Sequence, residues 1–206
     1  MYLVKTPLII SKLSSRSLVW KIPNKEKKLF LSFDDGPIPY LTMDILYYLA
    51  EFNAKATFFC VGENAKKYPE LIQRILDDGH SVANHSFQHI SGWKTATKKY
   101  IGNVKEASKY IDSKLFRPPY GRISYSQIKE LKADYKIIMW SILSGDFDEK
   151  ISNDQCLNNV LQSKEGDIIV FHDNIKSQEK IHHVLPRFLE HFTKLGYQFD
   201  VIPNNL

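Results

Sequence analysis

Short apolar runs that alternate with longer amphipathic stretches along the chain are the feature that most limits its fold. Short runs that are almost continuously apolar are typical of strands buried on both faces of a parallel sheet. Between them, apolar residues recur at helical spacing, as in Leu71, Ile72, Ile75 and Leu76. This pattern predicts strands at residues 29–33, 56–60, 81–84, 115–117, 136–140, 167–171 and 198–202.

Strand–helix alternation over the whole length implies an α/β fold with a parallel sheet. Helices are predicted at residues 43–51, 64–78, 94–113, 126–132, 153–161 and 178–195. About seven strands could close into a distorted (β/α) barrel or remain an open wound sheet, and periodicity alone does not decide between them. We favour the barrel because polar residues follow most of the strands, and the active sites of barrels lie at that face.

No repeat, low-complexity tract or linker interrupts the chain. Residues 1–206 are therefore predicted to form one domain, with residues 1–27 as an N-terminal lead-in segment.

The longest apolar run of this lead-in segment, residues 8–10, is too short for a signal-peptide core or a membrane span. No export signal is visible, so we expect a cytoplasmic protein by default, with association with the cell envelope as the alternative.

The net charge of +5 is spread over many lysines and forms no dense basic tract, so a nucleic-acid partner is not expected. The two cysteines, Cys60 and Cys156, provide neither a disulfide framework nor a CxxC zinc motif. A monomer is the expected state.

The first group of chemically competent residues is Asp34-Asp35 in Ser-Phe-Asp-Asp-Gly-Pro. Two adjacent carboxylates repel each other unless a cation or a proton lies between them. A metal ion could take one as a ligand and leave the other as a base. A bare Asp-Asp-Gly-Pro is more often only a turn, so this motif needs support from others.

The second group is His85 and His89, which are four residues apart. On one face of a helical turn, both imidazoles could reach one metal ion. With Asp35 they would make three protein ligands, the pattern of a catalytic metal site that keeps an open position.

The remaining groups also lie near strand ends. In Arg117-Pro-Pro-Tyr-Gly, two prolines stiffen a loop that could aim Arg117 at a carboxylate and present the Tyr120 N–H as an oxyanion donor. Asp146 and His172 follow later strands, and a buried histidine paired with a carboxylate can serve as a general acid.

Taken in this order, the five groups make the sequence resemble the polysaccharide deacetylase family, also called the NodB-homology or family 4 carbohydrate esterases. The resemblance covers roughly residues 28–202. It implies a distorted (β/α) barrel and a metal-dependent hydrolase that removes N-acetyl groups from amino-sugar polymers or oligomers, such as peptidoglycan, chitin-type glycans or exopolysaccharide.

The resemblance also implies roles for the individual residues. Asp35, His85 and His89 would bind one divalent metal, most commonly zinc, with cobalt, nickel or manganese as alternatives. Asp34 would be the general base oriented by Arg117, and His172 would be the general acid paired with Asp146. Further residues would complete the site, namely Tyr120 as oxyanion donor and Pro118, Phe147 and Val170 in the substrate pocket.

Two positions depart from the usual family pattern. Phe147 stands where the family often has Trp, and Val170 where it often has Leu. Both residues are apolar, so acetyl binding is expected to survive in a pocket of altered shape. Two other functions stay open: a catalytically inactive carbohydrate-binding module, and a hydrolase of the same fold that acts on O-acetyl esters or non-sugar amides.

Overall fold

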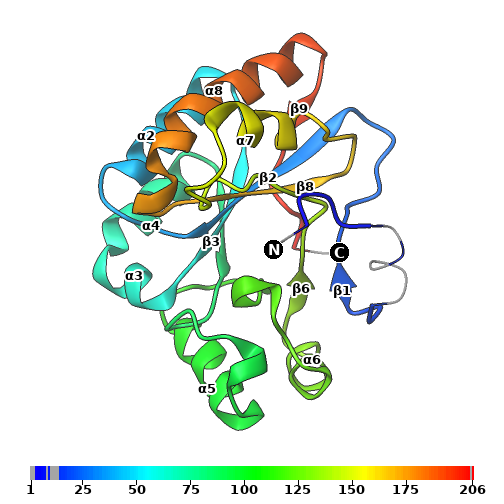
Figure 1. Cartoon of the computed structure of the whole chain (residues 1–206). Coiled ribbons are helices and arrows are strands. Elements are labelled where there is room, and N and C mark those ends of the chain that lie inside the picture. The colour runs from blue at the N-terminus through cyan, green and yellow to red at the C-terminus, as the bar shows by residue number, and fades with distance from the viewer. Residues whose placement is uncertain (1–2, 8, 10–13, 205) are drawn as a thin grey trace.

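The computed structural model describes residues 3–7, 9, 14–204 and 206, so part of the predicted N-terminal lead-in lies outside the described residues. The described residues form a nine-stranded sheet with helices around its outside (Figure 1). The strand order is β1-β6-β5-β4-β3-β2-β8-β7, and β9 pairs with β2. The strands are β1 (Leu18–Val19), β2 (Lys28–Asp35), β3 (Ala56–Cys60), β4 (Ser81–Asn84), β5 (Leu115–Phe116), β6 (Lys136–Ile138), β7 (Ile142–Leu143), β8 (Ile168–His172) and β9 (Gln198–Phe199).

The connection between β6 and β7 brings the two sides of this parallel sheet together. Only residues 139–141 separate these strands, yet β6 pairs with β5 while β7 pairs with β8. Within the connection, Ser141 N–H donates to the Ile168 carbonyl at 3.0 Å. The strand predicted at 136–140 therefore ends at Ile138, and β7, which was not predicted, follows after the chain bends from one neighbour to the other. The result is a distorted barrel, as predicted, whose strand order ends at β1 on one side and at β7 on the other.

The barrel interior is filled by side chains. One cluster takes a residue from each of six strands, and it comprises Phe30, Phe59, Ala83, Leu115, Ile138 and Ile168. The neighbours of Phe30, Leu29 and Leu31, belong to the larger cluster under the helices. Successive residues of a strand face opposite sides, so β2 is buried on both faces, as its apolar run predicted.

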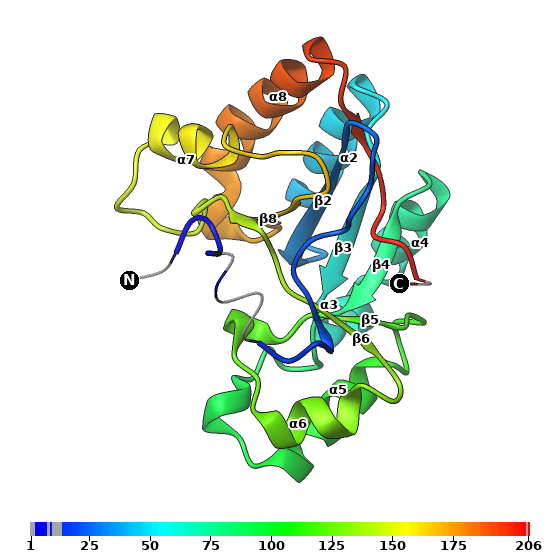
Figure 2. The ribbon, with the colours of Figure 1, turned by 90° about the vertical axis from the view of Figure 1, so that its right-hand side faces the viewer.

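Helices cover the barrel in two groups (Figure 2). One group, α2, α7 and α8, packs over the larger cluster, while α5 and α6 pack over a separate cluster against β5 and β6. The helices are α2 (Leu41–Glu51), α3 (Gly62–Lys67), α4 (Pro69–Asp77), α5 (Thr97–Ala107), α6 (Tyr125–Leu131), α7 (Asn153–Val160) and α8 (Gln178–Lys194). Three short 3-10 turns are η1 (Gly92–Lys94), η2 (Pro119–Gly121) and η3 (Ile175–Ser177).

Two predicted helices had wrong bounds, and one strand of the N-terminal segment was not predicted. The helix expected at 64–78 is two helices, because Pro69 begins α4 and pushes Tyr68 out of the helical region, to φ −129° and ψ 59°. The helix expected at 94–113 is η1 followed by α5, which ends at Ala107. The N-terminal segment contains β1, which pairs with β6 and was not predicted.

Among the described residues, no helix is long and apolar enough to cross a lipid bilayer.

Candidate active site

The chemically competent side chains gather at the C-terminal ends of the barrel strands. Asp34 and Asp35 end β2, and His172 ends β8. Because β2 and β8 are parallel neighbours, Asp34 and His172 are register partners. His85 directly follows β4 and Arg117 directly follows β5. Four stretches of sequence far apart in the chain therefore meet at one end of the sheet.

The two carboxylates at the end of β2 face the same site by different means. Asp34 continues the strand alternation that places Phe30 and Ser32 inside the barrel. Asp35 has φ 81°, in the left-handed region, so the alternation breaks at this residue. Asp34 Oδ2 lies 3.9 Å from His85 Nε2, and Asp35 Oδ1 lies 3.7 Å from the same atom.

The two histidines lie on a loop and not on a helical turn, which corrects the sequence prediction. Residues 85–90 have no helical assignment, and Ser86 and His89 have φ values of 63° and 51°. These left-handed residues fold the loop back, so that the two imidazole rings still approach, with centroids 5.0 Å apart. A buried hydrogen-bond pattern replaces the helix, since Ser86 N–H donates to Asn84 Oδ1 at 2.8 Å.

Asp35, His85 and His89 form the one group among the described residues whose donor atoms are close enough to share a metal ion, all within 4.8 Å of one another. Asp35 Oδ1 lies 3.1 Å from His89 Nε2, yet this buried oxygen has no partner in hydrogen-bond geometry among the described residues. An oxygen and two ring nitrogens that face one another without hydrogen bonding suit a cation between them.

The protonation states also suit a cation. Burial alone would raise the pKa of Asp35, but the close His89 ring and the charges of His172 and His85 hold it well below its ordinary value. Burial lowers the pKa of His85 to about 4, so this imidazole is neutral near pH 7. His85 Nδ1–H donates to the Arg117 carbonyl at 2.8 Å, which leaves the Nε2 lone pair directed at Asp35.

Arg117 is fully buried and forms a hydrogen-bonded ion pair with Asp34. Its Nη1 donates to Asp34 Oδ1 at 2.6 Å and to Ser32 Oγ at 2.8 Å, and Nη2 donates to the Met139 carbonyl at 3.2 Å. The guanidinium also lies 3.9 Å from the centroid of the Phe59 ring. Burial lowers the pKa of Arg117 and the Asp34 carboxylate opposes that shift. The guanidinium holds one Asp34 oxygen in place and leaves Oδ2 toward the histidines.

The loop after Arg117 presents the residues predicted to assist it. Tyr120 has φ 61°, and its N–H has no acceptor within the described part of the chain. The Tyr120 ring lies against the His89 ring, with centroids 4.6 Å apart. Pro118 is buried at the base of the loop and accepts a hydrogen bond from the Gly121 N–H. The loop therefore places the Tyr120 ring beside His89 and leaves the Tyr120 N–H available as a donor.

Asp146 and His172 make the second buried pair. The Asp146 carboxylate accepts a 2.7 Å hydrogen bond from His172 Nδ1 and a 2.6 Å bond from the His172 backbone N–H. Burial alone would lower the pKa of His172, but the Asp146 carboxylate, together with the charges of Asp35 and Asp34, raises it to about 9. His172 therefore carries a proton near neutral pH, and with Nδ1 engaged it can offer the proton from Nε2.

The two altered pocket positions lie beside His172. The Phe147 ring meets the His172 ring edge-on, with centroids 4.9 Å apart. Val170 is fully buried, and it shares a strand face with His172 because the two are separated by one residue. An apolar ring thus contacts the histidine whose other side is bound by Asp146.

Three polar residues of this region had no predicted role. Ser32 bonds Arg117, and its signal was a polar side chain within an apolar strand. Asn174 Nδ2 donates to Asp35 Oδ2 at 2.6 Å, and Asn64 Nδ2 donates to the Asp35 carbonyl at 2.8 Å. Asn64 lies in α3 and Asn174 precedes η3, and no sequence signal distinguishes these two asparagines from others.

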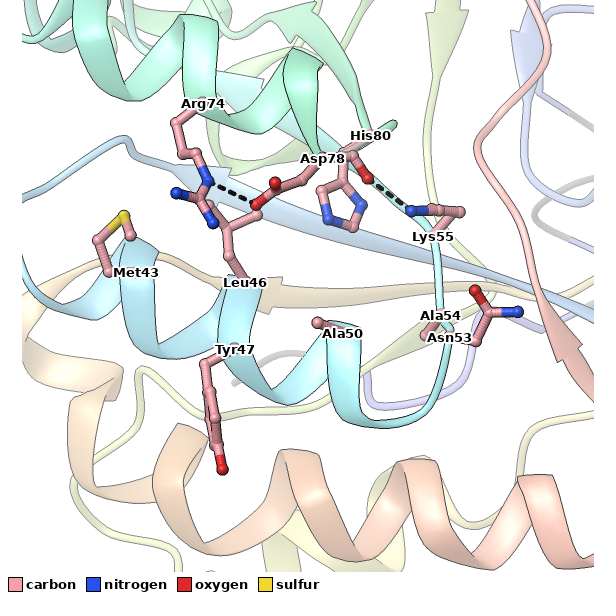
Figure 3. A pocket seen from close by; sticks show the side chains of 10 residues that line it. All are labelled: Met43, Leu46, Tyr47, Ala50, Asn53, Ala54, Lys55, Arg74, Asp78 and His80. Atoms are coloured by element: carbon pink, nitrogen blue, oxygen red, sulfur yellow. Dashed lines mark hydrogen bonds and ion pairs between the residues drawn. The ribbon is translucent and has the colours of Figure 1, made fainter.

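A different hollow of about 460 Å³ lies away from this site, between α2 and α4 (Figure 3). Two polar contacts lie at its edge. Arg74 forms an ion pair with Asp78, and Lys55 Nζ donates a hydrogen bond to the Asp78 carbonyl. None of the predicted site residues lines it. It lies near the N-terminal ends of β3 and β4, opposite to the face where the reactive groups meet.

Known proteins with similar sequences have the function that this site geometry suits. The sequence model of the family described as polysaccharide deacetylase matches residues 21–136, more than half of the chain. The chain belongs to the polysaccharide deacetylase family. A peptidoglycan-N-acetylglucosamine deacetylase of Bacillus cereus is 30% identical over 193 residues, which cover 90% of this chain and 91% of that protein.

Solved structures of deacetylases share the fold. The Bc1960 peptidoglycan N-acetylglucosamine deacetylase in complex with 4-naphthalen-1-yl-N-oxidanyl-benzamide superposes with a TM-score of 0.87 at 29% identity, covering 96% of this chain and 95% of that one. BA3943, a CE4 family pseudoenzyme from Bacillus anthracis, superposes with a TM-score of 0.79 at 20% identity, covering 93% of this chain and 69% of that one. Since this fold also occurs in a pseudoenzyme, the side chains of the site have to carry any argument for activity.

Proposed function

We propose that this polysaccharide deacetylase hydrolyses the N-acetyl groups of N-acetylglucosamine units in a peptidoglycan-type glycan. The observation that carries the proposal is the meeting of three groups at one barrel end. These are the Asp35–His85–His89 triad, the Arg117–Asp34 pair and the Asp146–His172 pair. A site with metal ligands, a base and an acid has every group that amide hydrolysis needs.

Asp35, His85 and His89 would hold one divalent cation, and their two nitrogens and one oxygen suit zinc. When bound, the cation supplies Lewis acidity toward the acetyl carbonyl and lowers the pKa of a water in its open position. Asn174 would keep Asp35 turned toward the ion, because it binds the other carboxylate oxygen.

The protein side chains would then move the protons. Asp34, held by Arg117 at one oxygen, accepts a proton from the attacking water with Oδ2. The Tyr120 N–H donates a hydrogen bond to the oxygen that becomes negative as the carbonyl carbon turns tetrahedral. His172 gives its proton to the amide nitrogen as the C–N bond breaks, so the products are acetate and a free amino sugar.

The arrangement argues against a carbohydrate-binding module without activity. A binding role requires neither a base held by a buried arginine nor a histidine whose pKa is raised to about 9 by a carboxylate. A hydrolase of O-acetyl esters would use the same groups, except that an alkoxide leaving group depends less on protonation by His172.

The test measures acetate released from N-acetylglucosamine oligomers, peptidoglycan and O-acetylated glycans. Metal-loaded protein, chelator-treated protein and Asp34→Asn are compared, with the exposed Asp134→Asn as the matched control. We expect release from N-acetylated glycans that disappears with chelator and with Asp34→Asn but persists in Asp134→Asn. Release from O-acetyl esters alone would reject N-deacetylation. No release from any substrate by protein that binds metal would reject a hydrolase of acetylated glycans.

A further inference from the structure

Large aromatic side chains are exposed on and around the loop that places the Tyr120 ring against His89. Trp93 on η1 is 68% exposed, and Tyr120 and Tyr125 are also exposed. None of the three belongs to a core cluster of the described residues. Aromatic side chains usually bury most of their surface, so exposed ones that cluster beside a site point to a ligand.

The loop that carries Trp93 is joined directly to the loop that carries Tyr120. Gly92 N–H donates to the Arg122 carbonyl at 3.1 Å, and Gln127 Nε2 donates to the carbonyls of Gly92 and Thr95. A Cβ at Gly92 would collide with the Arg122 carbonyl, so the two loops touch closely. Through Tyr120, whose ring contacts His89, this double loop continues to the proposed metal ligands.

The Trp93 ring is held rigidly despite its exposure. Its indole N–H donates to the Ile123 carbonyl at 3.2 Å, which fixes one edge of the ring. The Arg122 guanidinium lies over one face, 5.4 Å from the ring centroid. With 68% of Trp93 exposed, the ring keeps a large surface that solvent reaches. A fixed aromatic plane loses little entropy when a second ring stacks on it, which favours binding.

We infer that Trp93 and Arg122 form a sugar subsite away from the acetyl group, which holds another pyranose ring of the glycan strand during deacetylation. The C–H bonds on one face of a pyranose suit the negative face of an indole ring. The guanidinium at its side can donate to ring hydroxyls or to an acetamido oxygen. This inference rests on the proposed function, and it makes the enzyme selective for oligomers over single sugars.

The first experiment compares kcat/KM for N-acetylglucosamine oligomers, from dimer to hexamer, with kcat/KM for 4-nitrophenyl acetate. The small ester reaches the catalytic groups without reaching Trp93. In the native protein, kcat/KM is expected to rise with oligomer length. Trp93→Ala should lower kcat/KM for the hexamer about tenfold, mainly by raising KM. It should leave hydrolysis of the ester unchanged. Trp93→Phe should restore part of the loss.

The matched control is Tyr47→Ala, which removes an exposed aromatic ring from α2. It should change neither activity. Equal losses for hexamer and ester in Trp93→Ala would show a structural role for the indole and overturn the inference. An unchanged kcat/KM for the hexamer would also overturn it.

A second experiment separates this inference from the proposed function. Binding of the hexamer to metal-loaded Asp34→Asn protein is measured with and without Trp93→Ala, so no turnover is needed. Binding that weakens about tenfold with Trp93→Ala supports the subsite even if the native protein releases no acetate. The subsite is overturned if the Asp34→Asn protein does not bind the hexamer. It is also overturned if the affinity for the hexamer is the same with and without Trp93→Ala.

Discussion

The side-chain amide of Asn174 donates a 2.6 Å hydrogen bond to Asp35 Oδ2. Asn174 is itself fixed, because its Oδ1 accepts from the backbone N–H and from the hydroxyl of buried Ser177. Asp35 Oδ1 is thereby left facing the two histidines. The loop after His172 thus connects the proposed acid to the proposed metal site.

Asn174→Ala is expected to weaken zinc binding by roughly 10- to 100-fold, the usual cost of removing a group that orients a metal ligand. Chelator competition on the purified protein measures this. Asn153→Ala, which removes an exposed amide bonded to Glu179, is the matched control and should leave zinc affinity unchanged. Equal zinc affinity in Asn174→Ala and native protein would contradict the role of the amide.

Arg117→Ala is expected to destabilise the fold by about 3–5 kcal/mol, because it leaves the buried Asp34 carboxylate without its ionic partner. Denaturant unfolding of the metal-free protein measures the free energy. Adding Asp34→Asn should recover part of the loss by removing the uncompensated charge. Arg187→Ala, at an exposed arginine, should change the free energy of unfolding by less than about 0.5 kcal/mol. If Arg117→Ala lowers the free energy of unfolding by no more than Arg187→Ala does, the Arg117–Asp34 pair contributes little to stability.

In the metal-free protein, His172 is expected to titrate with a pKa of about 9, raised from 6.5. Because the folded-state pKa is the higher one, the resulting stability is complete below pH 6.5 and is lost as pH rises through about 9. NMR titration of the imidazole measures the pKa. Asp146→Asn should lower it, whereas Asp134→Asn should not. If the pKa of His172 is unchanged in Asp146→Asn, the Asp146 carboxylate does not raise it.

The same pair predicts the pH dependence of catalysis. Deprotonated His172 has no proton to give to the leaving nitrogen, so kcat for N-acetyl substrates should fall on the alkaline side. In Asp146→Asn, that fall should begin at lower pH. A profile that keeps the same alkaline limb in this variant would assign the limb to another group.

Two glycine substitutions should change stability in opposite directions. A Cβ at Gly36 would collide with the Asp173 carboxylate, so Gly36→Ala should cost about 1–3 kcal/mol. Gly102 lies in α5 with nothing within 4 Å of an added Cβ, so Gly102→Ala should stabilise by about 0.5–1 kcal/mol. Thermal unfolding checks both. Similar stability of the two variants would show that Asp173 moves aside easily.

Much of the fold was predictable because burial on both faces leaves a continuous apolar run. The strands β2, β3, β4 and β8 were located within about two residues for this reason. Two residues show no periodicity, so the two-residue strands β1 and β7 were missed, and the strands expected at 115–117 and 198–202 are longer than β5 and β9. These short strands exist because neighbouring strands supply their hydrogen bonds, and those neighbours are distant in sequence.

The sequence alone determined the reactive residues and the order in which they come, because a parallel barrel places every strand end on the same face. It did not reveal the loop that carries His85 and His89. A spacing of four predicts a helical turn, whereas left-handed residues at Ser86 and His89 produce the same approach of the rings.

The family resemblance implied the pairs Arg117–Asp34 and Asp146–His172, but only the tertiary structure shows the contacts that form them and the further partner of Asp35. Arg117 meets Asp34, and Asn174 meets Asp35, across more than eighty residues of chain in each pair. The raised pKa of His172 likewise depends on a carboxylate brought to it by another strand end. Hydrogen bonds and pKa values depend on distances through space, and the folded barrel sets those distances.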